Sequence, residues 1–228
     1  MLLSQIVLLR GGGMSLTPSL FPELIQTLID TIDKHAEEVT ELDQAIGDGD
    51  HVFNLQRGLQ ALREHAGEIA QVDWVAAWQK IGMTVMAAVG GASGSLYATL
   101  FIALAKNGKD KAIDLSGFSD AFLQAVEAVK QRGKADVGEK TMLDVLVPVA
   151  LVLRDEAAVG KPLAEVLERL CIVAADGVEA TRDMLATKGR ASFLGERSKG
   201  HIDAGAKTAQ LMIAAIAEVL KNAQAQPG

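Results

Sequence analysis

Three carboxylates lie within eight residues in the segment from Asp43 to Asp50, and Asp48 and Asp50 flank Gly49. Such a cluster repels itself unless a cation sits between the carboxylates. A hard cation that is held by only a few carboxylates keeps positions for water and for phosphate oxygens. The segment therefore indicates a Mg²⁺ site of the kind that binds a nucleotide. The alternative interpretation is that Asp48 and Asp50 are turn and N-cap residues, which aspartate favours.

The residues after the acidic segment favour the metal interpretation. His51 and Asn54 place hydrogen-bond donors at the expected start of a helix, where phosphate oxygens need them. A calcium EF-hand loop would continue with a ligand at its fifth position, which is Val52 in this chain. That loop type is therefore excluded, and a site shared by metal and phosphate is the better interpretation.

A second glycine-rich junction, residues 90–94, precedes another expected helix. Its backbone N–H groups and the Ser93 hydroxyl would suit a phosphate, although small residues also permit close helix packing. No Lys-Ser/Thr pair follows, so the junction is not a Walker A loop. Further along, Lys140 and Arg190 are candidate partners for polyphosphate charge or ordinary surface charges. Met142 is a candidate wall for an adenine or a core residue.

The composition is that of a helical protein without nucleic-acid or membrane features. The 228 residues are 49% hydrophobic but only 4% aromatic, and the net charge is −7 without a basic cluster. These values argue against direct nucleic-acid binding. No stretch approaches the ~18–20 continuous apolar residues of a membrane span. A single cysteine, Cys171, rules out an internal disulfide and fits a reducing compartment, which predicts a cytoplasmic location.

Apolar residues recur at helical spacing along most of the chain. In the first such segment Leu20, Leu24, Leu28 and Ile32 recur every four residues. The pattern predicts about eight helices, no convincing strand and therefore one all-α domain. Pro148 should kink its helix unless a neighbour absorbs the loss. The expected helices cover approximately residues 17–41, 51–65, 72–89, 93–106, 116–129, a segment from 140, 162–185 and 205–222.

The first residues of the chain are expected to lie outside this domain. Residues 1–14 are apolar and then glycine-rich, without the basic start or the clear cleavage site of a signal peptide. We expect them to form a disordered extension, and we place the domain at residues 15–228.

Several blocks of residues, in order along the chain, resemble the L subunit of dihydroxyacetone kinase. That subunit is similar to the nucleotide-binding domain of single-chain dihydroxyacetone kinases. The resemblance covers about residues 15–222. The blocks are Leu42-Asp43 with residues 46–51, Asn54 and Arg57-Gly58; residues 90–94; residues 132–135 with Gly138, residues 140–142 and Asp144; residues 189–198; and Gly200-His201 with Asp203 and Gly205-Ala206.

The resemblance implies a fold and a set of site residues. The fold would be a closed barrel of eight antiparallel helices with the nucleotide site at one end, and ADP or ATP would bind there with Mg²⁺. The implied metal ligands are Asp43, Asp48 and Asp50. The implied nucleotide contacts are His51, Asn54, Ala92, Ser93, Gly133, Met142, Arg190, Asp203 and Gly205.

The resemblance also implies a two-component enzyme. In this family the triose is bound covalently on a histidine of a separate K subunit, and the L subunit delivers the phosphoryl group to it. The donor is either a phosphohistidine carrier protein of the phosphotransferase system, which rephosphorylates bound ADP, or exchanging ATP. We therefore expect a kinase subunit for dihydroxyacetone or a close ketose that is inactive without its partner. The alternatives are a non-catalytic, nucleotide-dependent regulatory subunit and a helical scaffold with turn aspartates, and a homodimer is compatible with all three.

The chain departs from the family pattern beside the expected phosphate turn. Val52-Phe53 replaces the small residues, usually starting with glycine, that the family places after the histidine. No departure removes an implied metal ligand, so the departures bear on the ketose and on the phosphoryl donor. The others are Ser95 in place of Pro, Glu139 in place of Asp, Ile202 in place of Gln and Ala204 in place of Pro.

Overall fold

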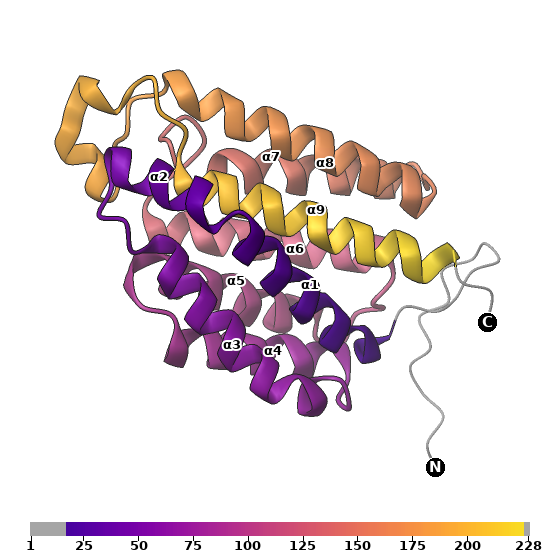
Figure 1. Cartoon of the computed structure of the whole chain (residues 1–228). Coiled ribbons are helices and arrows are strands. Elements are labelled where there is room, and N and C mark those ends of the chain that lie inside the picture. The colour runs from indigo at the N-terminus through magenta and orange to yellow at the C-terminus, as the bar shows by residue number, and fades with distance from the viewer. Residues whose placement is uncertain (1–16, 226–228) are drawn as a thin grey trace, which may run out of the picture.

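The computed structural model describes residues 17–225, and every regular element in this range is a helix, which confirms the all-α expectation (Figure 1). The expected extension, residues 1–14, lies outside the described residues. The α-helices are α1 (Phe21–Lys34), α2 (Ala36–Ile46), α3 (His51–Ile69), α4 (Trp74–Ala88), α5 (Gly91–Gly108), α6 (Leu115–Gly133), α7 (Leu143–Ala158), α8 (Leu163–Ala180) and α9 (Ala204–Ala225). Three short 3-10 helices are η1 (Pro18–Leu20), η2 (Thr181–Asp183) and η3 (Arg190–Ser198).

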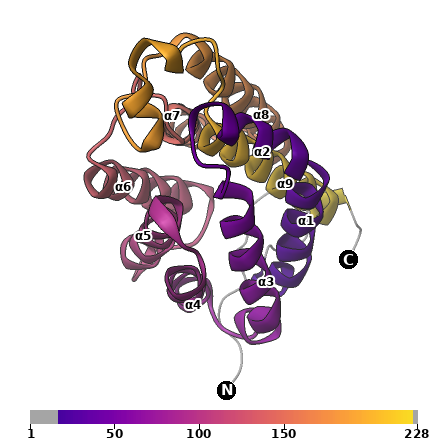
Figure 2. The same ribbon diagram turned by 60° about the vertical axis from the view of Figure 1, so that its left-hand side comes forward.

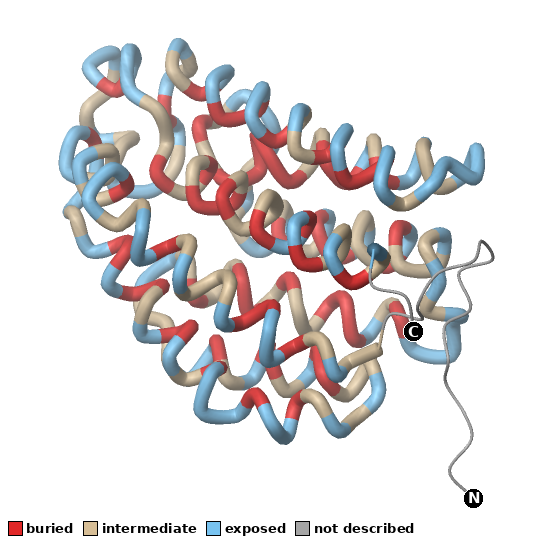
Figure 3. Tube along the Cα trace, turned by 45° about the vertical axis from the view of Figure 1, so that its right-hand side comes forward, coloured by how far each residue is buried: buried red, intermediate tan, exposed pale blue. Residues whose placement is uncertain are grey.

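The long helices pack mainly against their neighbours in the chain. From α3 to α9 each helix contacts the next, and α1 contacts both α3 and α9. Their buried faces join in one hydrophobic core, in which Ile32, Ile69, Val129 and Val166 are at most 1% exposed. Figure 3 shows the buried residues on the helix sides that face other helices and the exposed residues on the outer sides. The helical periodicity of the sequence therefore reports real burial.

The first expected helix, residues 17–41, is in fact two helices. His35 has φ −103° and ψ 11°, outside the helical region, so α1 ends at Lys34 and α2 begins at Ala36. α2 then contacts α3, α9 and η3. Because of this break, Asp43 lies on α2 and not on α1. The prediction of one continuous helix over residues 17–41 was therefore wrong.

The segment that carries Pro148 is helical. Val145, Leu146 and Val149 are buried in α7, which continues through Pro148 to Ala158. The apolar run around Pro148 is thus part of a helix, and the helical prediction for this segment is confirmed. Among residues 17–225, every helix falls short of the length and apolar character that a bilayer span demands.

One end of the molecule gathers the junctions that the sequence singles out. α2 and η3 lie at the same end as the starts of α3 and α5, and Figure 2 brings this end forward. The start of α1 and the end of α9 lie at the opposite end (Figure 1). Because the helices run from one end of the molecule to the other, their junctions place residues from distant parts of the chain at the same end.

Candidate functional site

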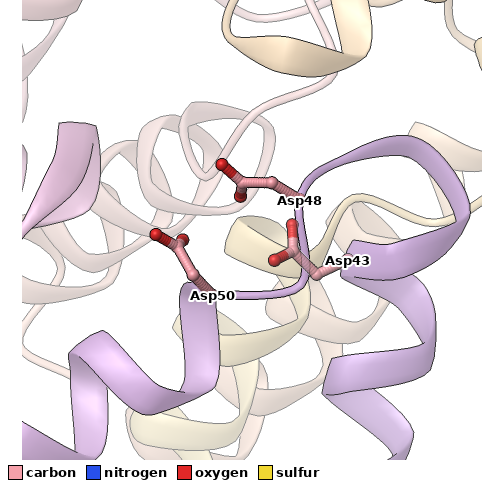
Figure 4. A group of neighbouring side chains, drawn as sticks. All are labelled: Asp43, Asp48 and Asp50. Carbon is pink, nitrogen blue, oxygen red and sulfur yellow. The ribbon is translucent and has the colours of Figure 1, made fainter.

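The three aspartates of the acidic segment lie together around the turn between α2 and α3 (Figure 4). Asp43 belongs to the last turn of α2, Asp48 to the connecting loop, and Asp50 precedes the first residue of α3. One carboxylate oxygen from each lies within 4.8 Å of those of the other two. Asp43 is half-buried, whereas Asp48 and Asp50 are exposed. The turn therefore presents a converging set of oxygen ligands to solvent.

Two glycines make this turn tight. The backbone N–H of Gly47 donates to the carbonyl oxygen of Asp43 at 2.5 Å, and a Cβ at position 47 would overlap the Asp43 carboxylate. Gly49 has φ +75°, a conformation that residues with a side chain rarely adopt. A larger residue at position 47 would push the Asp43 carboxylate aside, and one at position 49 would be strained by its positive φ and would meet the Gln44 side chain.

Asp50 occupies a helix N-cap position but does not act as one. Its side chain accepts no capping hydrogen bond in α3. Asp73 and Asp114, in contrast, accept backbone N–H groups at 2.9 Å and 2.8 Å at the starts of α4 and α6. The chain thus uses aspartate caps elsewhere but leaves the Asp50 carboxylate facing its two neighbours. This difference favours a ligand role over the turn-and-cap interpretation.

The donor set of this cluster fits Mg²⁺. Carboxylate oxygens are the ligands of hard cations, and a site with few carboxylates leaves positions for water and phosphate. In the structure the Asp48 carboxylate forms an ion pair with the guanidinium of Arg190, which is the first residue of η3. Arg190 is 72% exposed, so its charge is heavily screened by water. The pair nevertheless places the positive charge of η3 beside the cluster.

His51 follows the cluster and is turned inward. Its backbone N–H donates to Asp43 at 3.1 Å, while its ring contacts the hydroxyls of Ser93 at 3.1 Å and Thr208 at 2.9 Å. Burial lowers the pKa of the imidazole, and the nearby carboxylates of Asp43 and Asp50 oppose this shift. The ring is thus the centre of a buried polar contact between α3, α5 and α9. Sequence reasoning expected a direct phosphate contact from His51; the structure places both ring nitrogens on hydroxyls.

The glycine-rich junction lies beside this contact and begins α5. Gly90 is the N-cap, and a Cβ there would lie 2.9 Å from the Asn54 side-chain oxygen, which also accepts from Arg57 at 3.2 Å. Gly91 has φ +68°. The first-turn N–H groups of a helix, here around Ala92 and Ser93, have no partner within the helix and attract anions. The structure therefore places Asn54 next to the Ala92-Ser93 turn, and together they form a surface that could bind an anion.

The remaining expected contact residues come from three other segments. Met142 is buried just before α7, and Gly205 is its neighbour, because a Cβ at position 205 would lie 3.7 Å from the Met142 nitrogen. Asp203 caps α9 by accepting the Ala206 N–H at 2.7 Å. Gly133 ends α6 and approaches Leu96 of α5 rather than the acidic cluster.

Asp203 lies in an unusual electrostatic environment. Burial is the main cause that raises the pKa of its carboxyl to about 7, and the negative charges of Asp144 and Asp43 raise it further. The Ala206 N–H and the Lys140 ammonium act in the opposite direction. A carboxyl of this kind changes charge near neutral pH, so it can respond to a charged ligand nearby.

Lys140 has a role that its sequence context did not indicate. Its side chain is 2% exposed, and its ammonium donates to the carbonyl oxygens of Thr181 at 2.5 Å, Arg182 at 3.3 Å and His201. Desolvation lowers the pKa of this ammonium. Lys140 is therefore neither a surface charge nor free to reach a polyphosphate. It joins the segment before α7 to the segments on either side of η3.

Asp144 completes this internal support. Its carboxylate is 2% exposed and accepts the backbone N–H groups of Gly138 at 2.5 Å and Thr141 at 2.7 Å. Sequence reasoning included Asp144 only in the family resemblance and missed Thr181 and Thr208 altogether. A threonine hydroxyl that bonds a carbonyl of its own helix leaves no recognisable sequence pattern. The other partners of Thr181 and Thr208 are Asp203 and His51, which lie too far away in the chain to form a local motif.

Residues 45–218 of the chain match the DAK2 domain family. The chain belongs to that family. The chain is also similar to curated proteins along most of its length. One is the ADP-binding subunit DhaL of PEP-dependent dihydroxyacetone kinase 1 from Listeria innocua, with 38% identity over 81% of this chain and 88% of the relative. Another is the ADP-binding subunit DhaL of PEP-dependent dihydroxyacetone kinase from Escherichia coli, with 38% identity over 85% of this chain and 92% of the relative.

The chain is also similar to part of longer proteins. The human triokinase/FMN cyclase is 31% identical over 93% of this chain, but the match covers only 36% of that protein. A solved structure of dihydroxyacetone kinase from C. freundii, in complex with AMP-PNP and Mg²⁺, matches with a TM-score of 0.68 and 21% identity. That match covers 96% of this chain and 37% of the other, and it shows that the two share a fold.

Proposed function

We propose that the chain is the nucleotide-binding subunit of a dihydroxyacetone kinase and transfers a phosphoryl group to a ketose held on a separate K subunit. The observation that carries the proposal is the convergence of Asp43, Asp48 and Asp50 within 4.8 Å, beside the start of α5. The names of relatives at 38% identity, which are ADP-binding subunits of such kinases, support it. The ketose would be dihydroxyacetone or a close analogue.

Asp43, Asp48 and Asp50 would hold Mg²⁺. Bound there, Mg²⁺ would neutralise the charge that develops on the phosphate oxygens during transfer. The Ala92-Ser93 turn would bind phosphate oxygens through backbone N–H groups, and Asn54 would contribute its amide. Phosphoryl transfer depends mainly on positioning and electrostatics, so the absence of a nucleophile–base pair among these residues is no obstacle.

The segments beyond the turn would surround the rest of the nucleotide. Met142 would supply apolar contact, and Gly205 would allow the ligand to approach the backbone. Arg190 would exchange its Asp48 contact for phosphate oxygens, since the guanidinium suits both groups. Gly133 and Asp203 complete the proposed set. Lys140 would act indirectly, because its carbonyl contacts hold the segments around η3 in place.

The reaction replaces the P–O bond to ADP with a P–O bond to a ketose hydroxyl, and the hydroxyl proton is released. The relatives named PEP-dependent or PTS-dependent support a phosphohistidine carrier as donor, with ADP retained between cycles. The partner would supply the covalently held ketose, so the chain alone would turn over no free dihydroxyacetone. The proposed domain is residues 15–228. Its helices would form the closed barrel of eight that the resemblance implies, which is supported by the contacts of α1 with both α3 and α9.

Reconstitution tests the proposal. The purified chain, Mg-ADP, a dihydroxyacetone-binding K subunit and a phosphorylated phosphohistidine carrier should together form dihydroxyacetone phosphate. Omission of the chain, of the K subunit or of the carrier should abolish the product, whereas omission of added ADP should not, because the purified chain would already hold ADP. Native mass spectrometry of the purified chain should detect retained ADP. Turnover of free dihydroxyacetone by the chain alone would contradict the proposal, and nucleotide binding without transfer to any K subunit would favour the regulatory alternative.

A further inference from the structure

The imidazole of His51 lies between two hydroxyls from distant parts of the chain. Nδ1 is 3.1 Å from the Ser93 hydroxyl of α5, and Nε2 is 2.9 Å from the Thr208 hydroxyl of α9. Thr208 is 0% exposed and His51 is 9% exposed, so water does not compete freely for these contacts. Thr208 is not among the residues that the sequence led us to expect in the nucleotide or metal site.

The Thr208 hydroxyl has a second contact that fixes the direction of the first. Its oxygen lies 3.0 Å from the carbonyl oxygen of Gly205, and a carbonyl oxygen can only accept. The buried Tyr97 hydroxyl also lies beside Thr208, and because burial raises its pKa it keeps its proton and can donate to the Thr208 oxygen. A hydroxyl has one proton, which Thr208 therefore donates to Gly205. The contact with His51 must then be donated by the ring, so Nε2 carries a proton.

The protonated Nε2 determines what the other ring nitrogen does. In the neutral imidazole only one nitrogen is a donor, so Nδ1 accepts the proton of the Ser93 hydroxyl. The hydrogen bonds then run in one direction, from Ser93 to His51, from His51 to Thr208 and from Thr208 to the Gly205 carbonyl. The Ser93 hydroxyl proton points inward, which leaves the backbone N–H groups of α5 as the donors toward solvent.

We propose that Thr208 is a positioning residue for the phosphate-binding turn: it fixes the Nε2–H tautomer of His51 and, through His51, the orientation of the Ser93 hydroxyl. The phosphate role of that turn rests on the function proposed above, whereas the hydrogen-bond direction does not. The first measurement is therefore made on the free protein.

Nitrogen NMR of the imidazole distinguishes the two tautomers. The free wild-type protein should show His51 as the Nε2–H form. Thr208→Val, which keeps the shape but removes the acceptor, should shift the population or the resonances, and Thr208→Ser should restore them. Ser119→Ala is the matched control, because the buried Ser119 hydroxyl also donates three residues back, to Ser116 at 2.8 Å, but contacts no ring. A wild-type Nδ1–H form, or spectra unchanged by Thr208→Val, would overturn the proposal.

Nucleotide titration tests the consequence for the site. Thr208→Val should bind Mg-ADP about tenfold more weakly, because a His51 ring without its Thr208 partner would no longer hold Ser93, and with it the backbone N–H groups at the start of α5, in place. Thr208→Ser and Ser119→Ala should bind within twofold of wild type. In a Ser93→Ala background Thr208→Val should cost less than twofold more, because the residue acts through Ser93. An undiminished tenfold loss there would overturn the proposed route. If the wild type binds no Mg-ADP, the proposed function fails, and the tautomer of the unmodified protein still decides the role of Thr208.

Discussion

The backbone N–H of His51 donates to the Asp43 carboxylate at 3.1 Å and thereby joins the last turn of α2 to the first residue of α3. Asp43 consequently has a structural contact as well as a proposed metal role. Asp48 differs, because its one described partner is the exposed Arg190 side chain. The two aspartates should therefore respond differently to the same substitution.

Asp48→Asn should abolish the Mg²⁺-dependent part of Mg-ADP binding with little change in the stability of the free protein. A ligand at a thousand times its Kd stabilises a protein by about 4 kcal/mol, which corresponds to a rise of several degrees in Tm. Thermal unfolding of protein from which retained ADP has been removed by chelation of Mg²⁺, measured with and without added Mg-ADP, gives this rise, and Asp48→Asn should lose it. Asp43→Asn should also lower the Tm of the free protein. The exposed Asp120→Asn is the control, and an equal loss in that variant would count against a specific site.

The free energy of unfolding should fall as pH rises from about 4 to 7, in part because of Asp203. Its folded pKa is about 7, above the ordinary 3.8, so across this window the folded state keeps a proton that the unfolded state has lost. The slope from one such group is at most about 1.4 kcal/mol per pH unit. Asp203→Asn should reduce the slope while keeping an acceptor for the Ala206 N–H. Denaturant unfolding at several pH values, without Mg²⁺ or nucleotide, measures it; an unchanged slope would show that Asp203 is not the group.

Gly94→Ala and Gly67→Ala should have opposite effects on stability. A Cβ at Gly94 would overlap the carbonyl oxygen of Val89, so the start of α5 would have to move, at a cost of about 1–3 kcal/mol. Gly67 is exposed in the last turn of α3, and a Cβ there meets nothing within 4 Å, so alanine should stabilise by about 0.4–1 kcal/mol. Urea unfolding of both variants checks the contrast. Equal and small effects would indicate that the turn tolerates a side chain.

Phe53→Ala should alter transfer to the K subunit without altering nucleotide binding. Val52 is buried in the core, whereas Phe53 is 65% exposed beneath the Arg57 guanidinium. A groove of about 370 Å³ between α1 and α3 passes this ring. A partner that closes over the nucleotide end would meet it, so the KM for the K subunit should rise several-fold. The control is Val159→Ala. Val159 follows the last residue of α7 and is 70% exposed, so this substitution should change neither the KM for the K subunit nor nucleotide binding.

Lys140→Met should destabilise the protein by about 2–3 kcal/mol, because three carbonyl groups would lose their donor. The exposed Lys109→Met should be neutral. Hydrogen exchange should show faster opening of residues 181–203 in Lys140→Met alone. Exchange that is unchanged in this segment would mean that Lys140 does not hold it.

The sequence predicted those parts of the fold that depend on neighbours along the chain. The four-residue spacing of Leu20 to Ile32 identified a buried helix face, and the glycine turn at Asp48 identified the converging carboxylates. The break at His35 had no such pattern, because it depends on what α2 contacts in space. Likewise, η3 has too few apolar residues to show a period.

The site was predictable where chemistry is local. Asp43, Asp48 and Asp50 lie within one turn, and their types alone indicated a hard cation. The buried position of Lys140 was not predictable, because its carbonyl partners are more than 40 residues away in the chain. The ring of His51 is a similar case, with partners in α5 and α9.

The antiparallel contact between α1 and α9 has a practical consequence. Both the start of α1 and the end of α9 point away from the acidic cluster (Figure 1). A chain anchored to a sensor surface through its C-terminal side would therefore present the cluster to the solution. Binding of nucleotide and of a K subunit could then be followed on the same immobilised molecule.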